Sequence, residues 1–240
     1  GAYSFGSYDS KPYILLNYTD TLKDVFTIVH EMGHSMHSYY TRRTQPFTYG
    51  DHSIFTAEVA STVNESLLMH HLLDKETNET MRRYLINYYI EEFRTTLFRQ
   101  TMFAEFEMLT HKEVENGGVL TAEWMCKLYN DLNHQYFGPA LAPDEYIQYE
   151  WARIPHFYRA FYVYQYATGY SAATAISAKI LAEGEAARKN YIEFLKSGSS
   201  NDPVELLKIA GVDMSSPEPI RMAMETFKGL VEELEQLMQA

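Results

Sequence analysis

Residues 21–43 read TLKDVFTIVHEMGHSMHSYYTRR. Apolar residues recur in this stretch every three or four positions, which is typical of one face of an α-helix. Thr21 and Asp24 have the spacing of a capping box at a helix start. The two arginines at the other end suit the negative end of the helix dipole. The stretch therefore predicts an amphipathic helix over about residues 21–41.

This helix carries the HExxH pattern His30-Glu31-Met32-Gly33-His34. Residues four apart lie about 40° apart around a helix axis, so the two histidines share a face and can reach one metal ion. A catalytic zinc ion accepts imidazole ligands and keeps one position open for water, whose pKa falls to about 7. Glu31 is the predicted base that takes a proton from this water and passes it to the leaving amine. We expect one zinc ion per chain.

Chance is the main competing explanation for so short a motif. The chain has nine histidines, and the bare pattern would occur by accident in about a few per cent of such sequences. The helical register of the two histidines and the presence of a carboxylate downstream favour the metal site over ordinary surface or core histidines.

The third metal ligand follows by exclusion. A metzincin would need glycine at position 37 and histidine at position 40, where this chain has His37 and Tyr40. A second helix, predicted from about residue 53 to residue 75, instead carries Glu58 and Glu65, which are seven apart and share a face. Glu58 is nearer the start of that helix and the loop returning from the first one. We therefore expect Glu58 to bind the metal.

Two further assignments, for Glu65 and His37, depend on where these side chains lie. Ligating histidines usually donate their second N–H to a carboxylate or a carbonyl, and Glu65 is a candidate for that acceptor. An exposed helix charge is an equally good interpretation of Glu65. His37 lies on the side of the first helix that suits a hydrogen bond to a ligand or a contact with substrate, and lies too far round to bind the metal.

The rest of the chain predicts a mainly α protein with a small β element at its N-terminal end. Residues 13–18 are prone to form a strand, and residues 1–18 suggest one or two strands. Proline and glycine punctuate the remainder into helices. The predicted helices span residues 78–115, 121–136, 144–151, 156–166, 171–196, 203–210 and 217–239.

Composition excludes several classes of function. The apolar fraction is 46% and the formal net charge is −12, which indicates a packed core and argues against a nucleic-acid partner. No stretch has the roughly 18 apolar residues needed to span a bilayer, and we expect no membrane partner. The single cysteine, Cys126, cannot form an internal disulfide, which suits a reducing compartment.

Several motifs resemble the M3 family of zinc oligopeptidases, and within it the oligoendopeptidase F branch. They are HEMGHSMH at 30–37, FTAEVAS at 55–61 with Asn64-Glu65, PYILLNY at 12–18, IPHFY at 154–158, FYVYQYATG at 161–169, and the stretch from Leu206-Leu207 to Pro217-Glu218-Pro219. The resemblance implies a zincin-like, mainly α, cytoplasmic enzyme that hydrolyses oligopeptides within a closed channel. It also implies metal ligands at His30, His34 and Glu58 and the base at Glu31.

Family members carry a long helical region ahead of the strand with which this chain begins. We therefore expect residues 1–240 to be an M3-type catalytic domain and a fragment that lacks that N-terminal region. The missing region is a candidate partner that would complete the substrate channel.

A second cluster contains His156, Tyr158, Tyr162 and Tyr166. Tyrosines four apart share one face of a helix, and from spacing alone an aromatic packing stripe is the better interpretation. The resemblance instead implies that one or two of these residues donate hydrogen bonds to the charged oxygen of the tetrahedral intermediate. We expect His156 and at least one of Tyr158 and Tyr162 to do so, with Tyr166 contacting substrate or supporting the site.

Two other functions remain open at this point. The chain could be a zinc exopeptidase of the carboxypeptidase or dipeptidase type, which would need a fixed partner for a terminal charge. It could also be a metal-binding module that has no catalytic activity without its N-terminal region. The oligoendopeptidase is the hypothesis that we favour.

Overall fold

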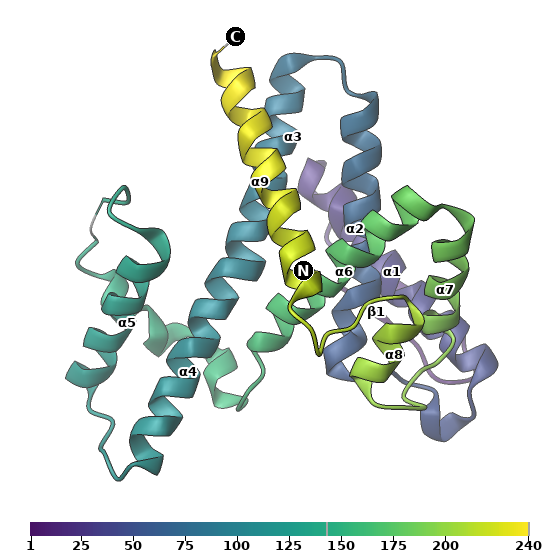
Figure 1. Ribbon diagram of the computed structural model, residues 1–240. Helices are drawn as coiled ribbons and strands as arrows, with labels where there is room; N and C mark the ends of the chain where they lie inside the picture. The colour runs from purple at the N-terminus through teal and green to yellow at the C-terminus, as the bar shows by residue number, and fades with distance from the viewer. Residues whose placement is uncertain (143, 240) are drawn as a thin grey trace. The chain divides into compact units, whose positions relative to one another are not determined.

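A computed structural model describes residues 1–142 and 144–239 of the chain, and helices account for most of them (Figure 1). The chain divides into two compact units, one formed by residues 1–91 with residues from 168 onward and the other by residues 92–167. The mainly α fold with a small N-terminal β element is therefore confirmed.

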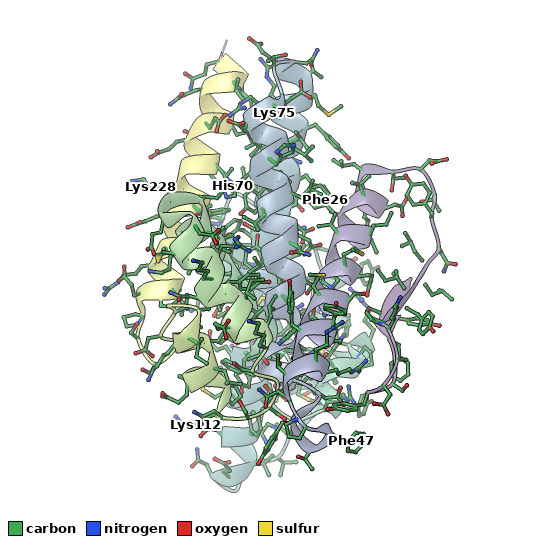
Figure 2. The ribbon with its side chains drawn as sticks, turned by 90° about the vertical axis from the view of Figure 1, so that its right-hand side faces the viewer. Phe26, Phe47, His70, Lys75, Lys112 and Lys228 are labelled. Atoms are coloured by element: carbon green, nitrogen blue, oxygen red, sulfur yellow. The ribbon has the colours of Figure 1, made fainter. Side chains whose placement is uncertain are left out.

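The first unit begins with a two-stranded antiparallel sheet. Strands β1 (Ala2–Phe5) and β2 (Tyr13–Leu16) pair with Ala2 opposite Leu16. The sheet packs on helix α1 (Leu22–Thr44), where the hydroxyls of Ser4 and Ser35 lie 2.8 Å apart. In Figure 2 the paired strands lie on the outer side of α1.

Helix α1 starts where the sequence predicts. The Thr21 hydroxyl accepts a hydrogen bond from the Asp24 N–H, and the Asp24 carboxylate accepts one from the Thr21 N–H, so the capping box is confirmed. Helix α2 (Ile54–Lys75) follows after a short 3₁₀ turn, η1 (Phe47–Tyr49), and runs beside α1 (Figure 2). At Gly33 the two helices approach so closely that an added Cβ would lie 2.4 Å from the Cα of Ser61.

Small side chains let helices pack closely in the core of the first unit. Val59, Ala60 and Val63 of α2 are fully buried against Ala172 and Ala173 of α6 (Tyr164–Glu183). Helices α7 (Glu185–Leu195) and α8 (Pro203–Ile209) complete this core. The unit also contains α3 (Glu79–Glu92) and α9 (Glu218–Gln239), where Arg82 pairs with Glu233 at 2.5 Å.

The second unit has its own apolar core. It contains α4 (Arg99–Glu115), α5 (Ala122–Phe137) and two 3₁₀ segments, η3 (Ile147–Arg153) and η4 (Pro155–Tyr158). The buried residues of one apolar cluster in this core are Met102, Phe103, Phe106, Tyr129, Leu132, Ile154 and Val163. Glu150 accepts hydrogen bonds from Tyr129 at 2.6 Å and Arg99 at 2.6 Å, and also pairs with Arg153.

The structure corrects four predicted helices. The helix predicted over 78–115 contains a wider π-helical turn, η2 (Phe93–Phe98), between α3 and α4. The helix predicted over 171–196 breaks at Gly184, whose positive φ of 65° cannot continue a right-handed helix. Residues 144–151 and 156–166 are also not the predicted α-helices, since only short 3₁₀ segments form before α6 begins at Tyr164. Within the described residues, none of the helices combines the length and the apolar character needed to cross a membrane.

Candidate metal centre

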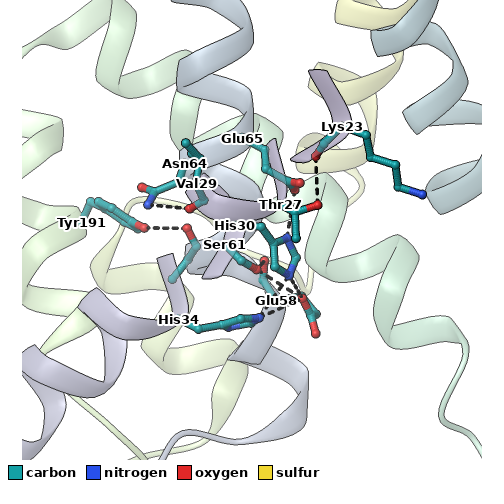
Figure 3. Close-up of polar contacts among 11 residues, drawn as sticks. Lys23, Thr27, Val29, His30, His34, Glu58, Ser61, Asn64, Glu65 and Tyr191 are labelled. Atoms are coloured by element: carbon teal, nitrogen blue, oxygen red, sulfur yellow. Dashed lines mark hydrogen bonds and ion pairs between the residues drawn. The ribbon is translucent and has the colours of Figure 1, made fainter. Parts of the chain in front are cut away.

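The predicted metal ligands meet at the place where α1 and α2 lie side by side. His30 and His34 are one turn apart on α1, and Glu58 lies in the second turn of α2. One potential ligand atom from each of the three residues lies within 4.8 Å of the others. Figure 3 shows the Glu58 carboxylate beside the two imidazole rings, with dashed lines to both. The structure thus brings together the residues that the motif and the exclusion argument selected.

The spacing of these atoms fits a single metal ion. The Nε2 atoms of His30 and His34 are 3.1 Å apart, and Oε2 of Glu58 lies 3.2 Å from the first and 3.5 Å from the second. Ligands about 2.0–2.1 Å from a tetrahedral zinc ion are about 3.3 Å from one another. The three atoms are therefore close to the positions that a shared ion would require.

The second ring nitrogen of His30 also has a partner. His30 Nδ1 lies 3.2 Å from Oε2 of Glu65, which Figure 3 shows above the imidazole ring. Contacts of this kind orient a ligating imidazole and raise its basicity. Glu65 therefore lies where a hydrogen-bond partner of a metal ligand should lie, and its functional role stays a prediction.

Charges around the site shift the pKa of each proposed ligand. Burial lowers the pKa of His30, but the carboxylates of Glu58 and Glu65 outweigh it and raise the pKa to about 10. Burial lowers the pKa of His34, and the nearby Glu58 only partly opposes this effect. Burial raises the pKa of Glu58, but its hydrogen bond with His30 and the charge of His34 lower it overall. Without a metal, the cluster therefore holds a proton on His30.

Glu31, the predicted base, is 7% exposed on α1 and is not part of the ligand cluster. Its negative charge acts on His34 and raises the pKa of that imidazole. The carboxylate therefore lies near the proposed metal ligands without competing for the same position. This placement is compatible with a proton acceptor, and the role itself stays a prediction.

His37 is buried, with 1% of its surface exposed. Its ring stacks on His52, with centroids 4.0 Å apart and planes 9° apart, and also lies 5.3 Å from the ring of Phe194. A direct contact between His37 and a substrate does not fit this burial. His52 belongs to none of the motifs described above, and the structure identifies it as the partner of His37.

The aromatic cluster of the second unit forms without the helix predicted for it. The His156 ring lies 5.7 Å from Tyr162 and 6.0 Å from Tyr166, and the two tyrosine rings are 5.4 Å apart. The Tyr166 hydroxyl donates a hydrogen bond to the Tyr162 oxygen at 3.3 Å. These three residues come together although Phe161, at φ 57°, interrupts the helical path between them.

Tyr158 lies apart from this cluster. Its side chain is 90% exposed, and it borders a cavity of about 700 Å³ whose lining includes Phe106, Trp151 and Phe157. The expectation that Tyr158, Tyr162 and Tyr166 share one helical face is therefore wrong, because Pro155–Tyr158 form a 3₁₀ turn. Any catalytic role for Tyr158 would need a contact other than this cluster.

Comparison with known proteins identifies the family of this chain. The sequence profile of peptidase family M3 matches residues 1–226. The chain belongs to peptidase family M3. Oligopeptidase PepF of Bacillus subtilis (strain 168) is 55% identical over 238 residues, which cover 99% of this chain and 36% of that protein. An oligoendopeptidase F homolog of Lactococcus lactis subsp. lactis (strain IL1403) is 49% identical over 239 residues, which cover 100% of this chain and 40% of that protein.

Solved structures agree with the M3 assignment. The crystal structure of oligoendopeptidase-F from Enterococcus faecium superposes with a TM-score of 0.82 at 47% sequence identity, over 91% of this chain and 40% of that one. This M3 chain thus spans about two fifths of the length of the relatives that it matches. The resemblance inferred from the motifs is confirmed at the level of the family and of the oligoendopeptidase F group.

Proposed function

We propose that residues 1–240 form the catalytic domain of a zinc endopeptidase that hydrolyses peptide bonds in short oligopeptides. The observation that carries the proposal is the convergence of His30, His34 and Glu58 on one potential metal position. Membership of family M3 supports peptide hydrolysis, and the names of the relatives, oligopeptidase PepF and oligoendopeptidase F, support short peptides as the substrate class.

The donor set favours zinc as the metal. Two imidazoles and one carboxylate match a catalytic zinc site better than the all-oxygen sites of magnesium or calcium. His30, His34 and Glu58 would hold the ion. When bound, zinc lowers the pKa of water and polarises a carbonyl group. Glu31 would accept the proton at its carboxylate and deliver it to the nitrogen of the leaving amine.

The carbonyl oxygen of the substrate gains negative charge during attack, and neutral hydrogen-bond donors can stabilise it. We assign this function to His156 and Tyr162. The hydrogen bond from Tyr166 to the Tyr162 oxygen supports the assignment, because it leaves the Tyr162 proton available for another acceptor. This assignment rests on the chemistry of the cluster and on the family.

Metal analysis and product analysis together test the proposed function. The purified chain is dialysed, its zinc content is measured, and it is then incubated with oligopeptides whose two termini are free or blocked. We expect one zinc per chain and internal cleavage of the blocked peptides. Cleavage of free peptides only would instead support an exopeptidase. If the chain takes up no zinc, the proposed metal site is contradicted, and the proposed function with it.

One further outcome of this test concerns the N-terminal region. Zinc uptake without cleavage at any peptide length would support the metal-binding module that we weighed as the alternative. Adding the N-terminal region that the family resemblance implies should restore cleavage if that region completes the channel. The cytoplasmic location implied by the family resemblance stays a prediction.

A further inference from the structure

The stacked imidazoles of His37 and His52 join α1 to the chain segment that enters α2. Their rings lie face to face at 4.0 Å, within 9° of parallel. His37 lies on α1, three residues after the ligand His34, and His52 lies two residues before the first residue of α2. The stack is therefore a contact between the two helices that supply the proposed metal ligands.

Both rings are neutral near neutral pH. The Nδ1 atoms of His37 and His52 are buried and have no hydrogen-bond partner among the described residues. Burial, then the charges of His52 and His34, hold the pKa of His37 well below its usual value. Burial, then the charge of His34, lowers the pKa of His52 to about 4, and Asp51 opposes this only in part. The pair therefore packs as two uncharged aromatic surfaces.

The stack lies next to the proposed metal position. His52 interacts electrostatically with both His34 and Glu58. Glu58 lies about one and a half helical turns beyond His52 in the sequence. A shift of His52 relative to α1 would move the first turns of α2 and, with them, the Glu58 carboxylate.

Other contacts hold the segment between the helices at earlier points. The Tyr8 hydroxyl donates to the Gln45 carbonyl at 2.5 Å, and the Ser199 N–H donates to the Tyr49 carbonyl at 3.3 Å. Ser53, which directly precedes α2, makes no side-chain hydrogen bond to the helix backbone. Arg42 of α1 also pairs with Asp51 at 3.2 Å, directly before His52 in the chain. The His52 stack is the next contact with α1 along the chain and lies closest to the start of α2.

We propose that His52 is a positioning residue whose stacking on His37 sets the placement of α2 at which Glu58 meets His30 and His34. This inference rests on the metal site proposed above. The proposal predicts that zinc affinity depends on a flat ring at position 52 and does not depend on the ring nitrogens of His52.

The test compares zinc affinity with stability for His52→Ala, His52→Phe and His52→Leu. Zinc dissociation constants are measured by competition with a chromophoric chelator, and melting temperatures are measured on the metal-free proteins. We expect His52→Ala to weaken zinc binding about 10- to 100-fold, as loss of an outer partner of a metal site typically does. His52→Phe should bind zinc within about threefold of the parent chain, since the stacked ring remains.

Ile86→Val is the matched control, because it trims a fully buried side chain of α3 in the same unit. It should lower the melting temperature and leave zinc affinity unchanged. Unchanged zinc affinity in folded His52→Ala, or equal losses in the Ala and Phe variants, would overturn the proposal. If His52→Ala does not fold, the zinc affinities of His52→Phe and His52→Leu provide the test. The proposal then requires that His52→Phe binds zinc tightly and that His52→Leu does not. Failure of the parent chain to bind zinc would instead refute the metal site itself.

Discussion

Gly33 of α1 lies directly against the backbone of Ser61 in α2, where an added Cβ would be 2.4 Å from the Ser61 Cα and 2.6 Å from the Ala60 carbonyl oxygen. Backbone atoms cannot move aside as a flexible side chain can. The absence of a side chain at position 33 therefore sets how closely the two helices approach. That distance in turn places Glu58 next to His30 and His34.

Gly33→Ala should consequently damage both stability and zinc binding. Overpacking of this kind costs about 1–3 kcal/mol, and separation of the helices would move Glu58 away from the histidines. Chemical denaturation and zinc titration measure the two effects. Gly229→Ala is the matched control, since nothing lies within 4 Å of a Cβ at that position in α9. It should be neutral or stabilising, and a Gly33→Ala variant that behaved likewise would contradict the close approach.

Glu31→Gln should keep the fold and the metal and abolish hydrolysis. The amide cannot accept a proton, whereas its size and its place outside the ligand cluster leave the ligands in position. Turnover, zinc content and melting temperature are measured together in an active preparation. Glu225→Gln, on an exposed position of α9, is the control and should retain full activity. Near-normal turnover of Glu31→Gln would exclude Glu31 as the base.

Zinc affinity should rise with pH. In the metal-free chain the carboxylates raise the His30 pKa to about 10, so this imidazole is protonated at neutral pH and must lose its proton to bind a metal. Zinc binding at pH 7 should therefore release about one proton, and the apparent affinity should rise about tenfold per pH unit below that pKa. Calorimetry in buffers with different ionisation enthalpies counts the released protons. An affinity that does not change between about pH 6 and 9 would contradict this assignment.

Tyr162→Phe and His156→Ala should each reduce turnover about 100- to 1000-fold, the typical cost of one donor to an oxyanion. Tyr158→Phe is the matched comparison from the same segment and should have a small effect, because Tyr158 is exposed and lies apart from the ring cluster. Turnover, KM and melting temperature are measured for each variant. Loss of activity only through unfolding would show that the cluster is an aromatic packing feature.

Local signals predicted the first two helices well. The capping box of Thr21 and Asp24 and the three-to-four residue periodicity act within a single helix, so they can be detected in the sequence. The predicted placement of Glu58 beside the two histidines of the motif also agrees with the structure. It could be predicted because Glu58 lies on the next helix along the chain. Its role as a ligand awaits metal binding.

Signals that depend on backbone conformation or on tertiary contact could not be detected in this way. The helix predicted over 156–166 does not form, because Phe161 takes a positive φ of 57° that its side chain does not indicate and that interrupts the helical path. His52 was missed for a different reason. Its importance comes from a stack on a residue of another element, and no spacing rule connects position 52 to position 37.

The proposed ligands all lie between positions 30 and 58, within one antiparallel helical hairpin. A metal that cross-links such a short stretch removes little conformational entropy from the unfolded chain, because loop-closure entropy grows with loop length. The hairpin is held instead by close helix contact at Gly33 and by the buried core around Val59 and Val63. Chelators should therefore empty the site and leave a folded apoprotein, unlike a small zinc finger, which unfolds when its metal is removed.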